Sequence, residues 1–345
     1  MRRAETSSQP RLVVAAPWVG AAWAVAFLAL GGLALLGRIT DPWEPDTASP
    51  LGDLTGLQMS ALLAALGALV LPALAVAALG RRPRAIVASG RLLVVLGMAV
   101  TVLVSDVRAL AFLGYLPMTL LAVVGVGPAA GHLEARSVME SGTALCHAVA
   151  GAGIVVAGVT AMHRSARLTG AAPASWQTWV RWGRPSVAVA VVVPRLYAVT
   201  RVAWALDIPL GVRREMLDEL GSARYAGLGL ALFAVVGAVL TWGLQARWGE
   251  VFWEWLPRYG GRRVPLGLAL VPGLLVAGVV MSAGLSFWRL VLTGELGRVP
   301  GATSDWAAWA PELLWPLWGV TLAVACLAYL GRRTAPTAPA APAGA

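Results

Sequence analysis

An arginine inside a long apolar segment is the side chain of this sequence whose position points most directly to chemistry. Arg195 follows Pro194 near the middle of Ser186–Leu206, a segment long enough to cross a membrane. A guanidinium keeps its proton and costs about 2.5–3.5 kcal/mol at the bilayer centre on insertion scales, so it needs hydrogen-bond acceptors. Arginine binds carboxylates and phosphates through paired hydrogen bonds. Arg195 is therefore either the anion contact of a binding site or a structural residue bonded to backbone carbonyls or to an acid on a neighbouring helix.

Two further side chains of the same segment are candidate substrate contacts. Arg201 follows Arg195 by six residues, which turn a helix by about 240°, so the two guanidinium groups lie on different faces. Tyr197 and Trp204 are seven residues apart and nearly share a face. We include Arg201 and Tyr197 with Arg195 among the residues expected to bind a substrate.

A second set of polar residues has the spacing of one helix face. His132, Arg136, Glu140, Thr143 and His147 follow one another at intervals of four, four, three and four residues. Glu140 and His147 are suited to a proton relay or to an acid/base pair in a membrane enzyme. The alternative is a helical extension on the outer side of the membrane with an ordinary Arg136–Glu140 ion pair and one hydrogen-bonded histidine. The set supplies at most three metal ligands, so we predict no metal site.

The composition places these residues in a membrane. Of 345 residues, 58% are hydrophobic and 13% are charged, about half the charge of a soluble domain. The only cysteines, Cys146 and Cys326, lie in apolar segments, which excludes a secreted disulfide scaffold. All 27 basic residues are arginines and most lie in short connections, so nucleic-acid binding is not expected. The sequence has no nucleotide-binding or metalloprotease motif and no soluble catalytic domain. We predict no cofactor, and favour a non-enzyme.

The apolar segments predict an all-α, polytopic membrane protein with eight transmembrane helices. With both termini in the cytoplasm, the inner connections hold about twice as many arginines as the outer ones, as the positive-inside rule requires. The protein is then a multi-pass protein of the inner (plasma) membrane. The predicted spans are Pro17–Leu36, Leu57–Leu79, Leu92–Phe112, Thr143–Met162, Ser186–Leu206, Tyr225–Leu244, Val264–Phe287 and Glu312–Leu330.

One apolar segment does not fit this count. Ala109–Gly127 follows Leu92–Ser105 after only three residues, and counting both as spans would abolish the arginine bias. We therefore expect part of 113–127 to be a re-entrant or interfacial segment that is broken at Pro117. Non-helical backbone at membrane depth is tolerated only where protein buries it.

The chain is expected to form one transmembrane domain, residues 12–331, between disordered ends at 1–11 and 332–345. Gly80-Arg-Arg-Pro83 and Gly261-Arg-Arg-Val-Pro265 occupy matching connections, which suggests a duplication of four helices, 12–170 and 171–331. The tryptophans of 176–182 and 248–255 are typical of interfacial belts.

Two segments of the second half carry a resemblance. They are Pro-Arg-Leu-Tyr-Ala-Val-Thr-Arg-Val-Ala-Trp-Ala-Leu-Asp-Ile-Pro-Leu-Gly (194–211) and Arg-Trp-Gly-Glu-Val-Phe-Trp-Glu-Trp-Leu-Pro followed by Gly-Arg-Arg-Val-Pro (247–265). Both resemble uncharacterised multi-pass membrane proteins of high-GC actinobacteria. The resemblance supports the topology and implies no chemistry.

Three functions are compatible with these residues. The first is binding or translocation of an anionic or amphipathic small molecule, with Arg195 as the anion contact and Glu140 and His147 available for proton coupling. The second is a membrane-embedded enzyme that modifies lipids or isoprenoids with the same residues. The third is a non-catalytic accessory protein whose arginine is structural. The lipid bilayer is a partner in each case.

Overall fold

The computed structural model describes residues 11–39, 49–123, 135–170 and 176–334. The described residues form ten α-helices and no β-strand, and eight of the helices are long and apolar enough to cross a membrane. The predicted all-α, polytopic fold with eight spans is confirmed. The helices are α1 (Arg11–Leu35), α2 (Gly56–Leu79), α3 (Pro83–Ala99), α4 (Val107–Val123), α5 (Ala135–Thr169), α6 (Gly183–Ala205), α7 (Arg214–Leu220), α8 (Ala223–Gly243), α9 (Leu266–Leu292) and α10 (Trp315–Arg333).

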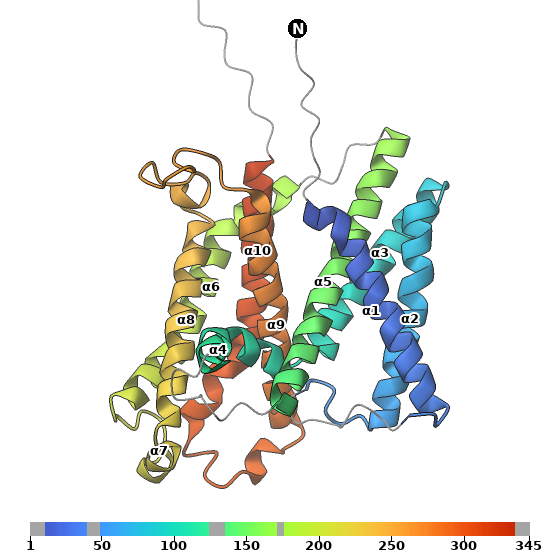
Figure 1. Cartoon of the computed structure of the whole chain (residues 1–345). Helices are drawn as coiled ribbons and strands as arrows, with labels where there is room; N and C mark the ends of the chain where they lie inside the picture. The colour runs from blue at the N-terminus through green and yellow to red at the C-terminus, as the bar shows by residue number, and fades with distance from the viewer. Residues whose placement is uncertain (1–10, 40–48, 124–134, 171–175, 335–345) are drawn as a thin grey trace, which may run out of the picture.

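The spanning helices alternate in direction, so α1 begins and α10 ends on the same side of the bundle (Figure 1). We call this the terminal side and the other the distal side. The predicted disordered ends lie almost wholly outside the described residues. Arg11, Arg332 and Arg333, however, belong to the ends of α1 and α10.

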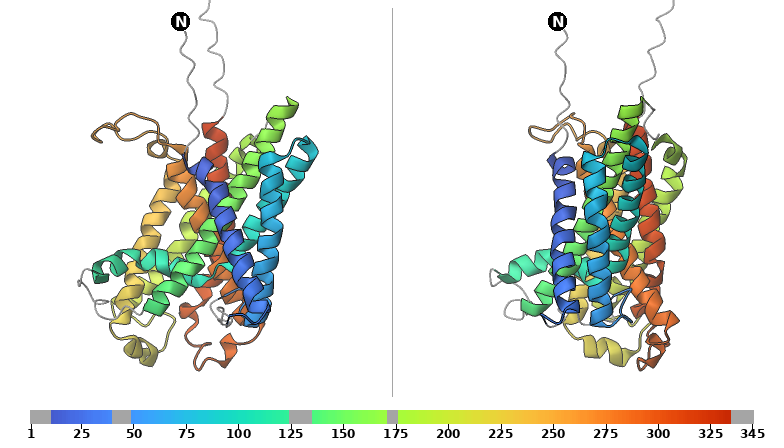
Figure 2. Two further views of the ribbon diagram at one scale, coloured as in Figure 1. Left: turned by 45° about the vertical axis from the view of Figure 1, so that its right-hand side comes forward. Right: turned by 90° about the vertical axis from the view of Figure 1, so that its right-hand side faces the viewer.

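The third span and the segment after it differ from the prediction. α3 continues through a π-helical turn, Val100–Val104, and the span ends at Val104 instead of at Phe112. α4 follows and lies across the other helices (Figures 1 and 2). It is therefore not a ninth span, as expected, but it continues as helix past Pro117, where a break was predicted. Residues 124–127 lie outside the described residues.

Hydrogen bonds explain why the chain turns here. The Asp106 carboxylate accepts a hydrogen bond from the backbone N–H of Arg108 at 2.8 Å, which replaces a helical bond at the start of α4. The hydroxyl of Ser105 donates to the carbonyl of Ala144, and Ser282 donates to the carbonyl of Ser105 at 2.7 Å. Ser282 of α9 thus satisfies a carbonyl of the interrupted backbone inside the bundle, and the side chain of Ser105 ties the turn to α5.

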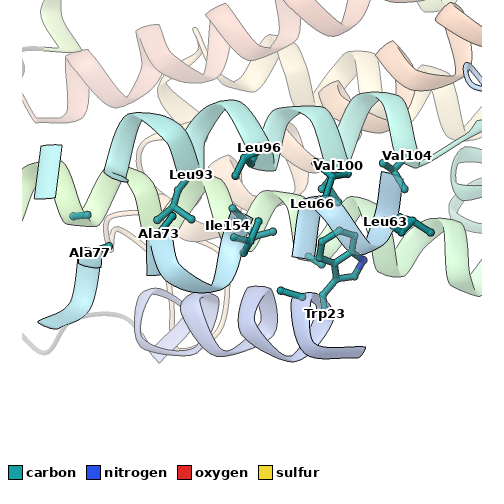
Figure 3. Close-up of a cluster of buried hydrophobic side chains, with 14 of the residues drawn as sticks. Trp23, Leu63, Leu66, Ala73, Ala77, Leu93, Leu96, Val100, Val104 and Ile154 are labelled. Atoms are coloured by element: carbon teal, nitrogen blue, oxygen red, sulfur yellow. The ribbon is translucent and has the colours of Figure 1, made fainter. Parts of the chain in front are cut away.

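The first four spans, α1, α2, α3 and α5, pack chiefly on one another, and we call them the first half. Their core consists of leucine, valine and alanine side chains together with Trp23, Ile86 and Ile154, and Figure 3 shows most of it. Small residues set the distance between α3 and α5. A Cβ atom added to Gly97 would lie 2.5 Å from the carbonyl oxygen of Gly151, so only glycine permits this approach.

The last four spans, α6, α8, α9 and α10, form the second half (Figure 1). Their core adds Trp315, Trp318 and Tyr329 to aliphatic side chains. The two halves meet where α4, the π-helical turn, α5 and α9 come together, around a small cluster that includes Ala148 and Val279. The two halves divide the chain between α5 and α6, where the predicted duplication also divides it. That the halves arose by duplication stays a prediction.

Candidate functional site

A buried ion pair joins α6 to the turn that precedes α10. Arg201 lies one helical turn before the end of α6, on the face that packs into the second half. Its Nη2 atom donates to Oε1 of Glu312 at 2.7 Å, and its Nη1 atom donates to the carbonyl of Ala307 at 2.9 Å and to Thr200 Oγ1 at 3.1 Å. The side chains of Arg201 and Glu312 are only 10% and 3% exposed. Such a pair is stable only because several acceptors replace the water around the guanidinium.

Aromatic rings surround the same guanidinium. Its central carbon lies 4.4 Å from the ring centroid of Tyr197 and 4.2 Å from that of Trp204. Trp315 meets Tyr197 edge to face at 5.8 Å and meets Phe287 in the same way. Aromatic faces stabilise a desolvated cation, so the charge of Arg201 is held by rings as well as by Glu312.

Only one of the two carboxylate oxygens of Glu312 accepts a hydrogen bond from Arg201. It lies in the 3₁₀ turn Ala310–Leu314, and its Oε2 atom is buried without a hydrogen-bond partner among the described residues. The same is true of the indole Nε1 of Trp315, one turn later. Unpaired buried polar atoms are rare and costly. The site therefore combines a neutralised cation with a spare acceptor and a spare donor.

The helix that lies across the bundle also reaches this region. Tyr115 of α4 is close enough to Tyr197 and Arg201 to interact electrostatically with both. α4 packs on α8, where a Cβ atom on Gly114 would lie 2.8 Å from the side chain of Leu230. We refer to Arg201, Glu312, Tyr197, Trp204 and Trp315 together as the Arg201 site.

The structure places Arg195 elsewhere. It lies on α6 as predicted, but it is exposed on the outer surface of the bundle, whereas Arg201 is buried. Among the described residues, Arg195 has neither a hydrogen bond nor an ion pair. Of the three α6 residues predicted to bind a substrate, Arg201 and Tyr197 come together and Arg195 does not join them. Its contact with a substrate stays a prediction.

The predicted helix face of α5 separates into two sets of contacts. His132 lies outside the described residues. Glu140 accepts from Arg136 Nε at 2.8 Å and lies 3.4 Å from Arg108 Nη1. His147 is buried, and its Nδ1 accepts a hydrogen bond from the indole of Trp23 at 2.9 Å, so its proton is on Nε2 when it is neutral. The Arg136–Glu140 ion pair and the hydrogen-bonded histidine, which the sequence allowed as the alternative to a proton relay, are both present. Glu140 and His147 have different partners.

Sequence reasoning selected neither Trp204 nor Trp315 for this site, and it also missed the charged partner, Glu312. Glu312 is the first residue of a predicted span, and 111 residues separate it from Arg201. A carboxylate at the start of an apolar segment and an arginine inside another are the signal that could have paired them. Within the described ranges, no group of three or more histidine, cysteine, aspartate or glutamate side chains is placed to hold a metal ion.

The fold therefore defines a class, that of all-α polytopic membrane proteins, with a buried Arg–Glu pair in its second half. No protein-family model, curated protein or solved structure matches the chain. The resemblance to actinobacterial membrane proteins stays a prediction.

Proposed function

We propose that this chain binds an amphipathic organic anion within the membrane, with Arg201 as the anion contact and Glu312 as a proton acceptor. The observation that supports this is the buried Arg201–Glu312 pair, whose second carboxylate oxygen has no partner in the described structure. Arginine is suited to carboxylate and phosphate ligands. The rings of Tyr197, Trp204 and Trp315 supply apolar surface for the rest of an amphipathic molecule.

Charge balance couples the anion to a proton. Glu312 already neutralises Arg201, so a second anion would bring two negative charges to one guanidinium at low dielectric. If Glu312 takes up a proton as the anion binds, its carboxylate becomes a neutral carboxyl group, and the net charge of the site stays at zero. The anion and the proton then bind together, and translocation would move both across the membrane.

The arginine distribution supports the orientation. The connections and helix ends on the terminal side hold about twice as many arginines as those on the distal side, including Arg81, Arg82, Arg262 and Arg263. Under the positive-inside rule, the terminal side faces the cytoplasm of a cell whose plasma membrane contains the protein. The Arg201 site, near the distal end of α6, then lies closer to the exterior.

Binding of decanoate to the full chain in a non-ionic detergent tests the proposal. Tryptophan fluorescence should report saturable binding, because Trp204 and Trp315 lie in the site. Affinity should increase as the pH falls from about 8 to about 6, where decanoate stays ionised, and a weakly buffered solution should show proton uptake. Decyltrimethylammonium, with the opposite charge, should not bind at the site.

Three variants separate the two roles. Glu312→Gln should bind decanoate equally at both pH values and without proton uptake. The double variant Arg201→Met/Glu312→Gln, which leaves no buried charge unpaired, should not bind it. Arg289→Met removes another buried arginine, one that pairs with Asp53, and should bind like the wild type. Unchanged proton uptake in Glu312→Gln, or unchanged binding in the double variant, would contradict the proposal.

A further inference from the structure

The outer face of α6 carries a charge that the described chain does not neutralise. Five of its exposed residues recur at intervals of four and three and lie on one stripe, and Leu196, which is also exposed, lies beside it. Arg195 is at the centre of this stripe, and the valines beside it are 38–58% exposed. Intervals of three and four are those of a helix that packs along another helix. The stripe, which we call the Arg195 face, consists of Ala188, Val192, Arg195, Val199 and Val202.

The depth of Arg195 makes lipid a poor environment for it. Twelve residues separate it from the start of α6 at Gly183 and ten from the end at Ala205, which correspond to about 18 Å and about 15 Å along the helix. Arg91 of α3 is also exposed, but it lies eight residues from Pro83, or about 12 Å from the start of its span. Long side chains near helix ends reach the membrane surface. Arg195 is farther from either surface than Arg91 and needs a closer acceptor.

A second copy of this chain does not supply that acceptor. Two copies that meet through the same face would bring two Arg195 residues together. The eight spans contain only two carboxylates, Glu140 and Glu312. Glu140 lies near the start of its span in contact with Arg136 and Arg108, and Glu312 is buried against Arg201. No carboxylate is exposed at mid-depth in the described spans.

We propose that the Arg195 face binds a transmembrane helix of another membrane protein, and that this helix carries an aspartate or glutamate at the depth of Arg195. Charge complementarity carries the proposal, because an opposite charge on an adjacent helix satisfies a guanidinium where water cannot. The short valine and alanine side chains let the partner backbone approach closely. This interaction is independent of anion binding at the Arg201 site, which lies on the buried face of the same helix.

A synthetic helix tests the proposal directly. The full chain is labelled with a donor fluorophore in phosphatidylcholine vesicles and mixed with acceptor-labelled polyleucine peptides that span the bilayer. The peptides carry one central glutamate, glutamine or lysine. Energy transfer should show that the glutamate peptide binds at least about tenfold more tightly than the glutamine peptide, as expected for a polar contact between helices in lipid. The lysine peptide should bind most weakly.

Variants of Arg195 make the result specific. Arg195→Leu should remove the preference for glutamate, and Arg195→Glu should reverse it in favour of lysine. Both should fold, because the side chain contacts no described polar partner, and thermal unfolding checks this. Arg91→Leu is the matched control and should keep the preference. Equal binding of the glutamate and glutamine peptides by the wild type would overturn the proposal. So would a preference that anionic lipid abolishes, which would assign Arg195 to lipid headgroups.

Discussion

The two halves of the bundle bury different kinds of polar groups. On the described spanning helices of the first half, the buried polar side chains are all neutral, such as Ser60, Thr101 and His147, and the buried Asp106 lies in the turn between α3 and α4. In the second half, Arg201 and Arg289 are buried on spanning helices, and Glu312 is buried in the 3₁₀ turn that precedes α10. The first half is held by close packing of small residues, whereas the second also depends on opposite charges that meet without water.

This difference assigns a structural role to the first half and a capacity for changes in charge to the second. A hydroxyl that donates to a carbonyl of its own or a neighbouring helix, as Thr101 does to Gly97, has no charge to change. A buried ion pair can change when a proton or a competing ion reaches it. We therefore expect the first half to respond mainly to changes in shape and the second mainly to changes in charge.

The largest expected effect is at Arg201. Arg201→Met leaves the buried Glu312 carboxylate unpaired, which should cost about 3–5 kcal/mol of unfolding free energy. Arg201→Met/Glu312→Leu should recover most of this loss. Denaturant unfolding in detergent micelles measures both. Equal stability of the single and double variants would show that charge does not dominate this region.

A change of shape in the first half should have the next largest effect. Gly151→Leu places a side chain against the backbone of α3 and should cost about 1–3 kcal/mol by overpacking. Gly142→Leu in the same helix is the matched control, since a Cβ atom there meets no atom within 4 Å. The same unfolding assay compares them. If both variants are equally stable, close packing does not hold α3 to α5.

The smallest effect concerns an ion pair in a connection. The hydrogen bonds from Arg213, with distances of 2.7–3.3 Å, lower the pKa of Asp305. The lowered pKa adds stability above the ordinary carboxyl pKa of about 4, and this contribution is lost as the pH falls through the folded-state value. Asp305→Asn should therefore flatten the loss of stability between about pH 5 and pH 2, by less than about 1 kcal/mol. An unchanged acid profile would exclude this pair as a contributor.

The sequence predicted the spans well because apolar length alone determines them. It also predicted that Arg195 and Arg201 lie on different faces, which follows from helical rotation. The end of the third span was misplaced by several residues. Ser105 and Asp106 end it through bonds to α5 and α9, and apolar length does not reveal such tertiary contacts.

The site was only partly predictable for the same reason. Arg201 and Tyr197 were selected from one helix, where spacing shows which residues share a face. Glu312 comes from a different helix, and spacing within one helix does not identify partners on another. Arg195 was selected from the same helix and lies on its exposed face, because spacing shows which residues share a face but not which face packs inward.

The distance in sequence between Arg201 and Glu312 has a consequence for biosynthesis. The ribosome makes Arg201 111 residues before Glu312, so α6 emerges from the ribosome before its counter-charge exists. In that interval the guanidinium must stay at the translocation channel or borrow carbonyl groups from nascent neighbours, since inserting it alone costs about 2.5–3.5 kcal/mol. The second half can therefore complete its packing in the membrane only after the segment that contains Glu312 and α10 has been synthesised.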